Sequence, residues 1–205
     1  MKIICVGMNY AAHNKELQNT LILQEPTVFL KPDSSLLKDG KPFYIPDFSE
    51  DMQYETELVV KINRLGKSIA PRFAHRYYDE ITVGIDFTAR DLQRQFRKDG
   101  LPWELCKAFD NSAAVGRFIS LSEKGYDVNN IPFSLTINDR EVQSASTQEQ
   151  LFQVDAIIAY VSRFFTLKIG DLIFTGTPSG VGRVHINDHL QGYVHGEKLL
   201  DFYVK

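Results

Sequence analysis

The sequence predicts an α+β fold that is mainly β, with a few peripheral helices. Two observations indicate this class. Several short segments are rich in β-branched or alternating apolar residues, and one long segment has strong helical periodicity. The 205 residues contain no internal repeat, low-complexity tract or linker, so one domain over residues 1–205 is expected.

The predicted strands of the N-terminal part are short apolar runs next to Gly or Pro, which are typical of strand ends. In chain order they cover residues 3–6, 26–32, 43–46 and 54–62. A short helix over residues 9–17 is expected after the first of them, with Asn9 as its N-cap.

Further along, Pro71 is well placed to begin a helix that carries Phe73, Tyr77 and Tyr78. A helix over residues 89–99 is expected to stop at Gly100. The strongest helix prediction covers residues 151–165, whose apolar residues recur at helical spacing. The remaining predicted strands cover residues 81–87, 133–137 (with a hairpin turn at 138–141), 172–174 and 199–204.

Composition excludes several classes of protein. A net charge of −3, without a basic run, argues against a nucleic-acid binder. No apolar stretch is long enough for a bilayer, and residues 1–7 are too brief for a signal peptide. Cys5 and Cys106 form neither a disulfide framework nor a metal motif, so we expect a reducing compartment, the cytoplasm.

The segment 54–62 carries two acids at strand spacing. Alternate side chains of a strand point to opposite faces, so Glu55 and Glu57 emerge on one side and Thr56, Leu58, Val60 and Ile62 on the other. The two positions lie about 6.6 Å apart along the backbone, so both carboxylates can reach one cation. The alternative is an edge strand with solvated acids.

A third acid, Asp86, ends another predicted strand. Three carboxylates suit a hard cation, Mg²⁺, Mn²⁺ or Ca²⁺, and suit zinc or copper poorly. Three protein ligands on an octahedral ion leave positions for substrate and water, as in a catalytic site. An EF-hand is excluded, because the sequence lacks its acidic loop of about twelve residues.

Two further features lie elsewhere in the chain. On a helix, His13 and Glu16 are i,i+3 neighbours and can meet, although a surface contact is the simpler interpretation. The glycine-rich segment 175–182 lacks the Lys-Ser/Thr ending of a phosphate-binding P-loop. Its backbone N–H groups either bind an anionic ligand or form a tight structural turn.

Together these motifs resemble the fumarylacetoacetate hydrolase superfamily, and above all its short, single-domain branch of acylpyruvate hydrolases and oxaloacetate decarboxylases. The resemblance extends from about residue 3 to the C-terminus. In chain order the motifs are Cys5-Val6-Gly7 with Asn9-Tyr10 and His13, Phe29-Leu30-Lys31-Pro32, Glu55-Thr56-Glu57-Leu58, Asp86-Phe87-Thr88-Ala89-Arg90-Asp91, Gly100-Leu101-Pro102-Trp103, Lys107, and the segment 175–182.

The resemblance implies a role for each matching residue and a mixed β-sandwich roll as the fold. It further implies Mg²⁺ or Mn²⁺ as cofactor, with Ca²⁺ possible, a small 2-oxo acid as substrate, and a homodimer. Residues 9–24 would form a lid that orders over substrate. The implied site residues are Glu55, Glu57 and Asp86 as metal ligands; His13, Glu16 and Lys107 as catalytic residues; and Arg90, Gln93, Thr177 and Lys31 as substrate-binding residues.

Two departures from the family pattern bear on specificity. Met8 stands where many relatives have Arg, and the segment 113–116 lacks a proline that often follows the lysine. Neither removes a metal ligand.

The implied chemistry is cleavage beyond C3 of a metal-chelated 2-oxo acid, leaving a pyruvate enolate. If C3 carries an acyl group, water must attack the acyl carbonyl, and His13 is the candidate general base. If C3 carries a carboxylate, CO₂ leaves and no attacking water is required. The leading hypothesis is therefore an acylpyruvate hydrolase and oxaloacetate decarboxylase. The alternatives are an isomerase or decarboxylase of dicarboxylic intermediates in aromatic catabolism, an oxaloacetate tautomerase, and a non-catalytic metal-binding module.

Overall fold

The computed structural model describes residues 1–17 and 23–205. Its largest sheet is mixed, with the order β2-β1-β12-β5-β6-β8-β3 and with β9 also paired to β6. β1 runs parallel to β12, and β5 runs antiparallel to β6. The strands are β1 (Ile3–Gly7), β2 (Thr27–Lys31), β3 (Leu36–Leu37), β5 (Thr56–Ile62), β6 (Tyr78–Asp86), β8 (Ala113–Val115), β9 (Ile119–Ser120) and β12 (Leu172–Phe174).

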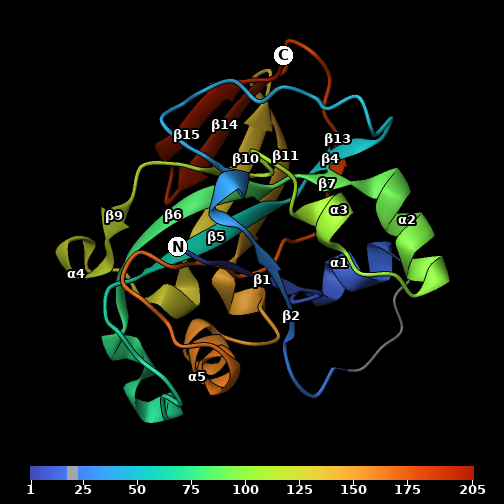
Figure 1. The fold of residues 1–205 in the computed structure, drawn as a ribbon. Helices are drawn as coiled ribbons and strands as arrows, with labels where there is room; N and C mark the ends of the chain where they lie inside the picture. The colour runs from blue at the N-terminus through green and yellow to red at the C-terminus, as the bar shows by residue number, and fades with distance from the viewer. Residues whose placement is uncertain (18–22) are drawn as a thin grey trace.

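A second sheet has the order β11-β10-β14-β15, and a small third one has the order β13-β4-β7. β14 and β15 contact β6, and β10 contacts β5, so the second sheet packs against the first (Figure 1). The chain is mainly β and mixed, as predicted. The strands are β4 (Met52–Tyr54), β7 (Thr88–Ala89), β10 (Pro132–Ile137), β11 (Arg140–Ser146), β13 (Gly182–Arg183), β14 (His189–Val194) and β15 (Glu197–Tyr203).

Helices lie at the periphery, and α1, α2 and α3 gather on one side of the molecule (Figure 1). No helix among the described residues is long and apolar enough to span a membrane. The α-helices are α1 (Ala11–Glu16), α2 (Arg90–Asp99), α3 (Glu104–Lys107), α4 (Leu121–Lys124) and α5 (Val154–Phe164). The 3₁₀ helices are η1 (Asp33–Ser35), η2 (Pro71–Arg76), η3 (Val128–Asn130) and η4 (Thr147–Glu149).

The core follows the alternation of β5. Leu58, Val60 and Ile62 are fully buried in the main apolar cluster, together with residues of the second sheet and of α5. Val59 points to the opposite face and joins a smaller cluster. The predicted two-residue period is therefore correct, and it separates the apolar side of β5 from the side that carries Glu57.

Several element boundaries differ from the predictions. The strand predicted over residues 54–62 is interrupted at Glu55, which lies between β4 and β5. The helix predicted at Pro71 is the 3₁₀ helix η2, and Tyr78 instead opens β6, where it pairs with Ile62. The predicted hairpin is confirmed, with Asn138 and its neighbour at positive φ between β10 and β11.

Asn9 is not the N-cap of α1, since Tyr10 holds that position. The Asn9 side chain donates to the carbonyls of Phe152 and Thr175, and it accepts from the Phe152 N–H. The Leu151 N–H donates to the Asn9 carbonyl. These bonds hold residues 151 and 152 outside the helix, which explains why α5 begins three residues later than predicted.

The predicted lid, residues 9–24, lies partly outside the described residues, because 18–22 are not described. Its described part contains α1, in which His13 and Asn14 are buried.

Candidate active site

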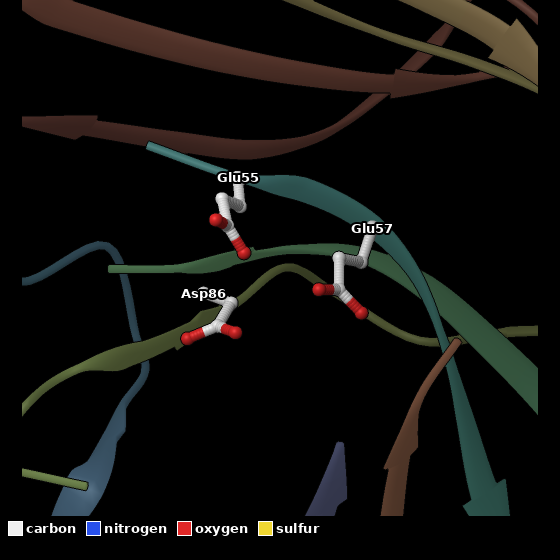
Figure 2. A group of neighbouring side chains, drawn as sticks. All are labelled: Glu55, Glu57 and Asp86. Carbon is white, nitrogen blue, oxygen red and sulfur yellow. The ribbon is translucent and has the colours of Figure 1, made fainter. Parts of the chain in front are cut away.

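Three carboxylates converge where β5 and β6 lie side by side (Figure 2). Glu57 is on β5 opposite Gly84 of β6, and the Asp86 N–H donates to the Glu55 carbonyl at 2.8 Å. This pairing brings one oxygen of each acid within 4.8 Å of the others. All three residues are at most 5% exposed, so this is a buried acidic triad.

Three basic side chains neutralise part of this triad. Lys107 Nζ lies 2.6 Å from Glu55 Oε2 and 2.7 Å from Asp86 Oδ2. The Arg90 guanidinium pairs with Glu55 Oε1, and Lys31 Nζ lies 2.7 Å from Asp86 Oδ1. Glu55 and Asp86 each therefore have two cationic partners.

Glu57 differs from the other two acids. It has no ion pair with a basic side chain within residues 1–17 and 23–205, and it accepts one hydrogen bond from the Gly176 N–H at 2.6 Å. Burial, together with the negative charges of Asp86 and Glu55, raises the pKa of Glu57 well above its usual range. Burial also tends to raise the pKa of Glu55, but the positive charges of Lys107 and Arg90 outweigh this effect, so the pKa of Glu55 is lowered.

The triad fits a hard divalent cation. Its donors are all carboxylate oxygens, which suit Mg²⁺, Mn²⁺ or Ca²⁺. A cation between them would offset the repulsion that Glu57 experiences from Glu55 and Asp86, because an unpaired buried carboxylate is costly. The residues that would hold the ion are the three acids of the triad.

The triad forms the inner end of a cavity of about 150 Å³. Thr177, His13, Lys107, Arg90 and Gln93 line it as well, so most of the predicted site residues are brought together. Seven residues that the sequence did not single out as site residues complete the lining: Val6, Gly7, Met8, Leu17, Phe29, Arg97 and Trp103.

Two predicted site residues are not part of the cavity lining. Lys31 is completely buried, and its Nζ also donates to the Lys107 carbonyl and to the Ser112 carbonyl and hydroxyl, the latter two at 3.0 Å. Lys31 thus braces Asp86 and the backbone of Lys107 from behind. Glu16 is not in the cavity lining either, but it contacts His13, which is.

The predicted contact between His13 and Glu16 is present. His13 Nδ1 lies 3.0 Å from Glu16 Oε2, and the Gly180 N–H donates to Glu16 Oε1 at 3.0 Å. Glu16 fixes one ring nitrogen of His13, which is buried, so the contact is not a simple surface pair.

The glycine-rich segment 175–182 binds carboxylates of the protein itself. Its Gly176 and Gly180 N–H groups donate to Glu57 and Glu16. Gly176 has φ +100°, and a Cβ there would lie 2.7 Å from Asn9 Cβ, so this position requires glycine. The amides of this segment thus hold two acids of the site, while Thr177 of the same segment lines the cavity.

Two of the glutamines that position these groups, Gln53 and Gln143, were not predicted as site residues. Gln53 accepts from Arg90 Nε at 2.8 Å, and Gln93 accepts from Arg90 NH1 at 2.5 Å. Gln143 accepts from the Thr56 N–H and donates to Thr177 Oγ1. No sequence pattern signals the long-range contacts that Gln53 and Gln143 make.

Comparison with known proteins gives consistent results. The family model described as fumarylacetoacetate (FAA) hydrolase C-terminal matches residues 2–200. Oxaloacetate tautomerase FAHD1 from mouse mitochondria is 38% identical over 203 residues, covering 99% of this chain and 91% of the relative. Oxaloacetate tautomerase YcgM from Escherichia coli is 37% identical over 198 residues, covering 97% and 90%.

A solved structure is similarly close. The fumarylpyruvate hydrolase of Pseudomonas aeruginosa, in complex with Mn²⁺ and pyruvate, superposes with a TM-score of 0.93 at 34% identity. The match covers 100% of this chain and 89% of the other.

Proposed function

This chain belongs to the fumarylacetoacetate hydrolase family, and we propose that it is a divalent-metal-dependent enzyme acting on short 2-oxo acids. Its main reaction is cleavage of acylpyruvates, such as acetylpyruvate or fumarylpyruvate, to pyruvate and a carboxylic acid. Decarboxylation of oxaloacetate follows the same course, because each reaction leaves an electron pair on C3 of pyruvate.

The observation that supports this proposal most strongly is the buried triad at the closed end of the cavity, with Lys107 beside it. A divalent cation bound there would supply Lewis-acid stabilisation of the negative charge that develops on the oxo oxygen. Lys107, held by Glu55 and Asp86, places a second positive charge at the same end. Arg90 keeps Glu55 in position.

Hydrolysis also requires an activated water. His13 lines the cavity and accepts the proton of that water, while Glu16 orients the ring. The water oxygen bonds to the acyl carbonyl carbon, the bond from this carbon to C3 breaks, and its electron pair stays on pyruvate until C3 is protonated. Decarboxylation needs no such water.

Oxaloacetate tautomerisation is the second candidate function, and the two tautomerase relatives favour it. It needs the same charge stabilisation on the oxo oxygen, but only a proton transfer at C3. The two candidates therefore share the inner end of the cavity and differ in whether His13 must activate water.

The decisive experiment is a turnover screen with Mg²⁺ or Mn²⁺, with a chelator-treated sample as the control. Its substrates are acetylpyruvate, fumarylpyruvate, oxaloacetate and an unsaturated hydroxy-dienedioate. Pyruvate release from an acylpyruvate supports the main proposal, and enol–keto exchange of oxaloacetate alone supports the second candidate. Equal rates after metal removal would contradict both, and turnover of the dienedioate alone would indicate an isomerase.

A further inference from the structure

Helix α2 presents one face to the cavity. Arg90, Gln93 and Arg97 are spaced i, i+3 and i+7 along it, and all three line the cavity. Seven residues correspond to about 10 Å along a helix axis. Arg90 is therefore buried beside the triad, whereas Arg97 is exposed at the outer end.

These two arginines differ in their partners. Each of the three guanidinium nitrogens of Arg90 donates to a protein partner, Gln53, Gln93 or Glu55. Arg97 has no hydrogen-bond or ion-pair partner in the part of the chain that the structure describes. Exposure alone does not explain this, since Arg94 of the same helix is 62% exposed and pairs with Asp51 at 2.9 Å. The donors of Arg97 are thus available to a ligand in the cavity.

The wall of the cavity also includes aromatic side chains. Phe29 and Trp103 meet edge to face at 5.8 Å, and both are half-buried. Lys107 Nζ lies 5.3 Å from the centre of the Phe29 ring, so this wall reaches the inner end. Flat aromatic surfaces suit a flat, unsaturated carbon chain. The cavity thus has charged groups at both ends and an aromatic wall.

We propose that Arg97 binds the distal carboxylate of the substrate, so that the preferred substrates are 2-oxo acids with a second carboxylate at the far end of the chain. This inference rests on the proposed function, which places the 2-oxo acid group at the triad. An arginine fork matches a carboxylate with two parallel hydrogen bonds, and such charged pairs are the strong ones. Acylpyruvates that end in a carboxylate therefore bind better than acetylpyruvate.

Lys98 provides a matched control for the alternative that Arg97 has a purely structural role. Arg97 and Lys98 both lie in the last turn of α2, where a positive charge favours the helix dipole. Lys98 is exposed and lies outside the cavity lining. Replacing either residue removes one positive charge from the same turn, and only Arg97 faces the cavity.

The test uses two unreactive ligands that differ only at the far end, 2-oxoadipate and 2-oxohexanoate. Their dissociation constants are measured by calorimetry in the presence of Mg²⁺, for the wild type, Arg97→Ala, Arg97→Lys and Lys98→Ala. Arg97→Ala is expected to weaken 2-oxoadipate binding by about 10- to 100-fold, the range for a hydrogen bond to a charged group. Binding of 2-oxohexanoate should change less than about twofold, and Arg97→Lys should be intermediate.

The possible outcomes separate the two proposals. If both ligands bind the wild type, but Arg97→Ala weakens them equally or not at all, the role of Arg97 is contradicted and the proposed function stands. An equal effect of Lys98→Ala contradicts it as well, because the effect then comes from charge alone. If neither ligand binds the wild type, the proposed function fails and the role of Arg97 fails with it.

Discussion

The two ends of the cavity are built on different principles. At the inner end, three carboxylates and three basic side chains are buried, and all of them except Glu57 are joined by ion pairs. At the outer end, Met8, Leu17 and Trp103 are half-buried, and Arg97 is exposed and unpaired among the described residues. Most side chains of the inner end are held by several bonds at once, so the inner end is overdetermined. Arg97 at the outer end has no such bond among the described residues, so its replacement breaks none.

This difference separates chemistry from substrate choice. Removing a partner from a buried ion pair leaves an uncompensated charge, which is strongly destabilising, so the inner residues are constrained by folding as well as by catalysis. An unpaired surface residue can change at almost no cost in stability. Under the proposed function, the reaction common to many 2-oxo acids therefore depends on the inner end, and selection among these acids depends on the outer end.

The largest expected effect is at Glu57. Glu57→Ala removes a ligand of the proposed metal site, so divalent-cation affinity should fall by more than about 100-fold, since losing merely an outer partner of a ligand costs 10–100-fold. Hydrolysis and decarboxylation should be lost together, as measured by calorimetry and turnover. The fold should survive, because Glu57 has no cationic partner among the described residues.

Glu80→Ala is the control, because Glu80 lies on the surface, paired with Lys61. Retention of either activity by Glu57→Ala at low metal concentration would contradict the assignment of Glu57.

A smaller effect, restricted to one reaction, is expected at His13. His13→Ala should reduce acylpyruvate hydrolysis by about 10²–10⁴-fold, the usual contribution of a general base. Oxaloacetate decarboxylation should fall much less, because it needs no attacking water. Both rates are measured on the same preparation at saturating metal, with the exposed His185→Ala as the control.

Equal loss of both activities in His13→Ala, with metal and oxalate binding intact, would show that the dyad serves a step common to both reactions.

The contrast between the two ends also predicts different effects on stability. Lys31→Met breaks the ion pair with Asp86 and should cost about 3–5 kcal/mol of unfolding free energy. Arg97→Met, at the exposed outer end, should stay within about 0.5 kcal/mol. Urea unfolding of the two variants measures this difference, and similar values would mean that the inner end is not overdetermined.

The smallest expected effect concerns the predicted lid, residues 9–24. Amides of its helix α1 should exchange faster than those of β5 without ligand, since segments that close over substrate have low local stability. Oxalate with Mn²⁺, at about ten times its Kd, should slow exchange in α1 about tenfold. Exchange that is equally slow with and without oxalate would argue against a lid.

The sequence predicted those parts of the site that depend on local geometry. Strand alternation placed Glu57 opposite the apolar side of β5, and helical spacing brought His13 and Glu16 together. The same helical spacing places Arg97 on the face of α2 that carries Arg90, so the sequence contains a local signal for Arg97.

Other features depend on long-range contacts and carry no local signal. Gln143 binds the Thr56 N–H across 87 positions, and the Lys31 side chain reaches the Ser112 carbonyl across 81. The late start of α5 has the same origin, because the Asn9 side chain binds the backbone at Phe152 across 143 positions. Periodicity cannot report partners that only the completed fold brings together.

The most direct measurement is anomalous diffraction from crystals grown with Mn²⁺ and oxalate. We expect one Mn²⁺ peak per chain at the inner end, about 2.0–2.6 Å from a carboxylate oxygen of each of Glu55, Glu57 and Asp86. A bound Mn²⁺ located elsewhere, with these three carboxylates left to Lys107, Arg90 and Lys31 alone, would contradict the metal-dependent function.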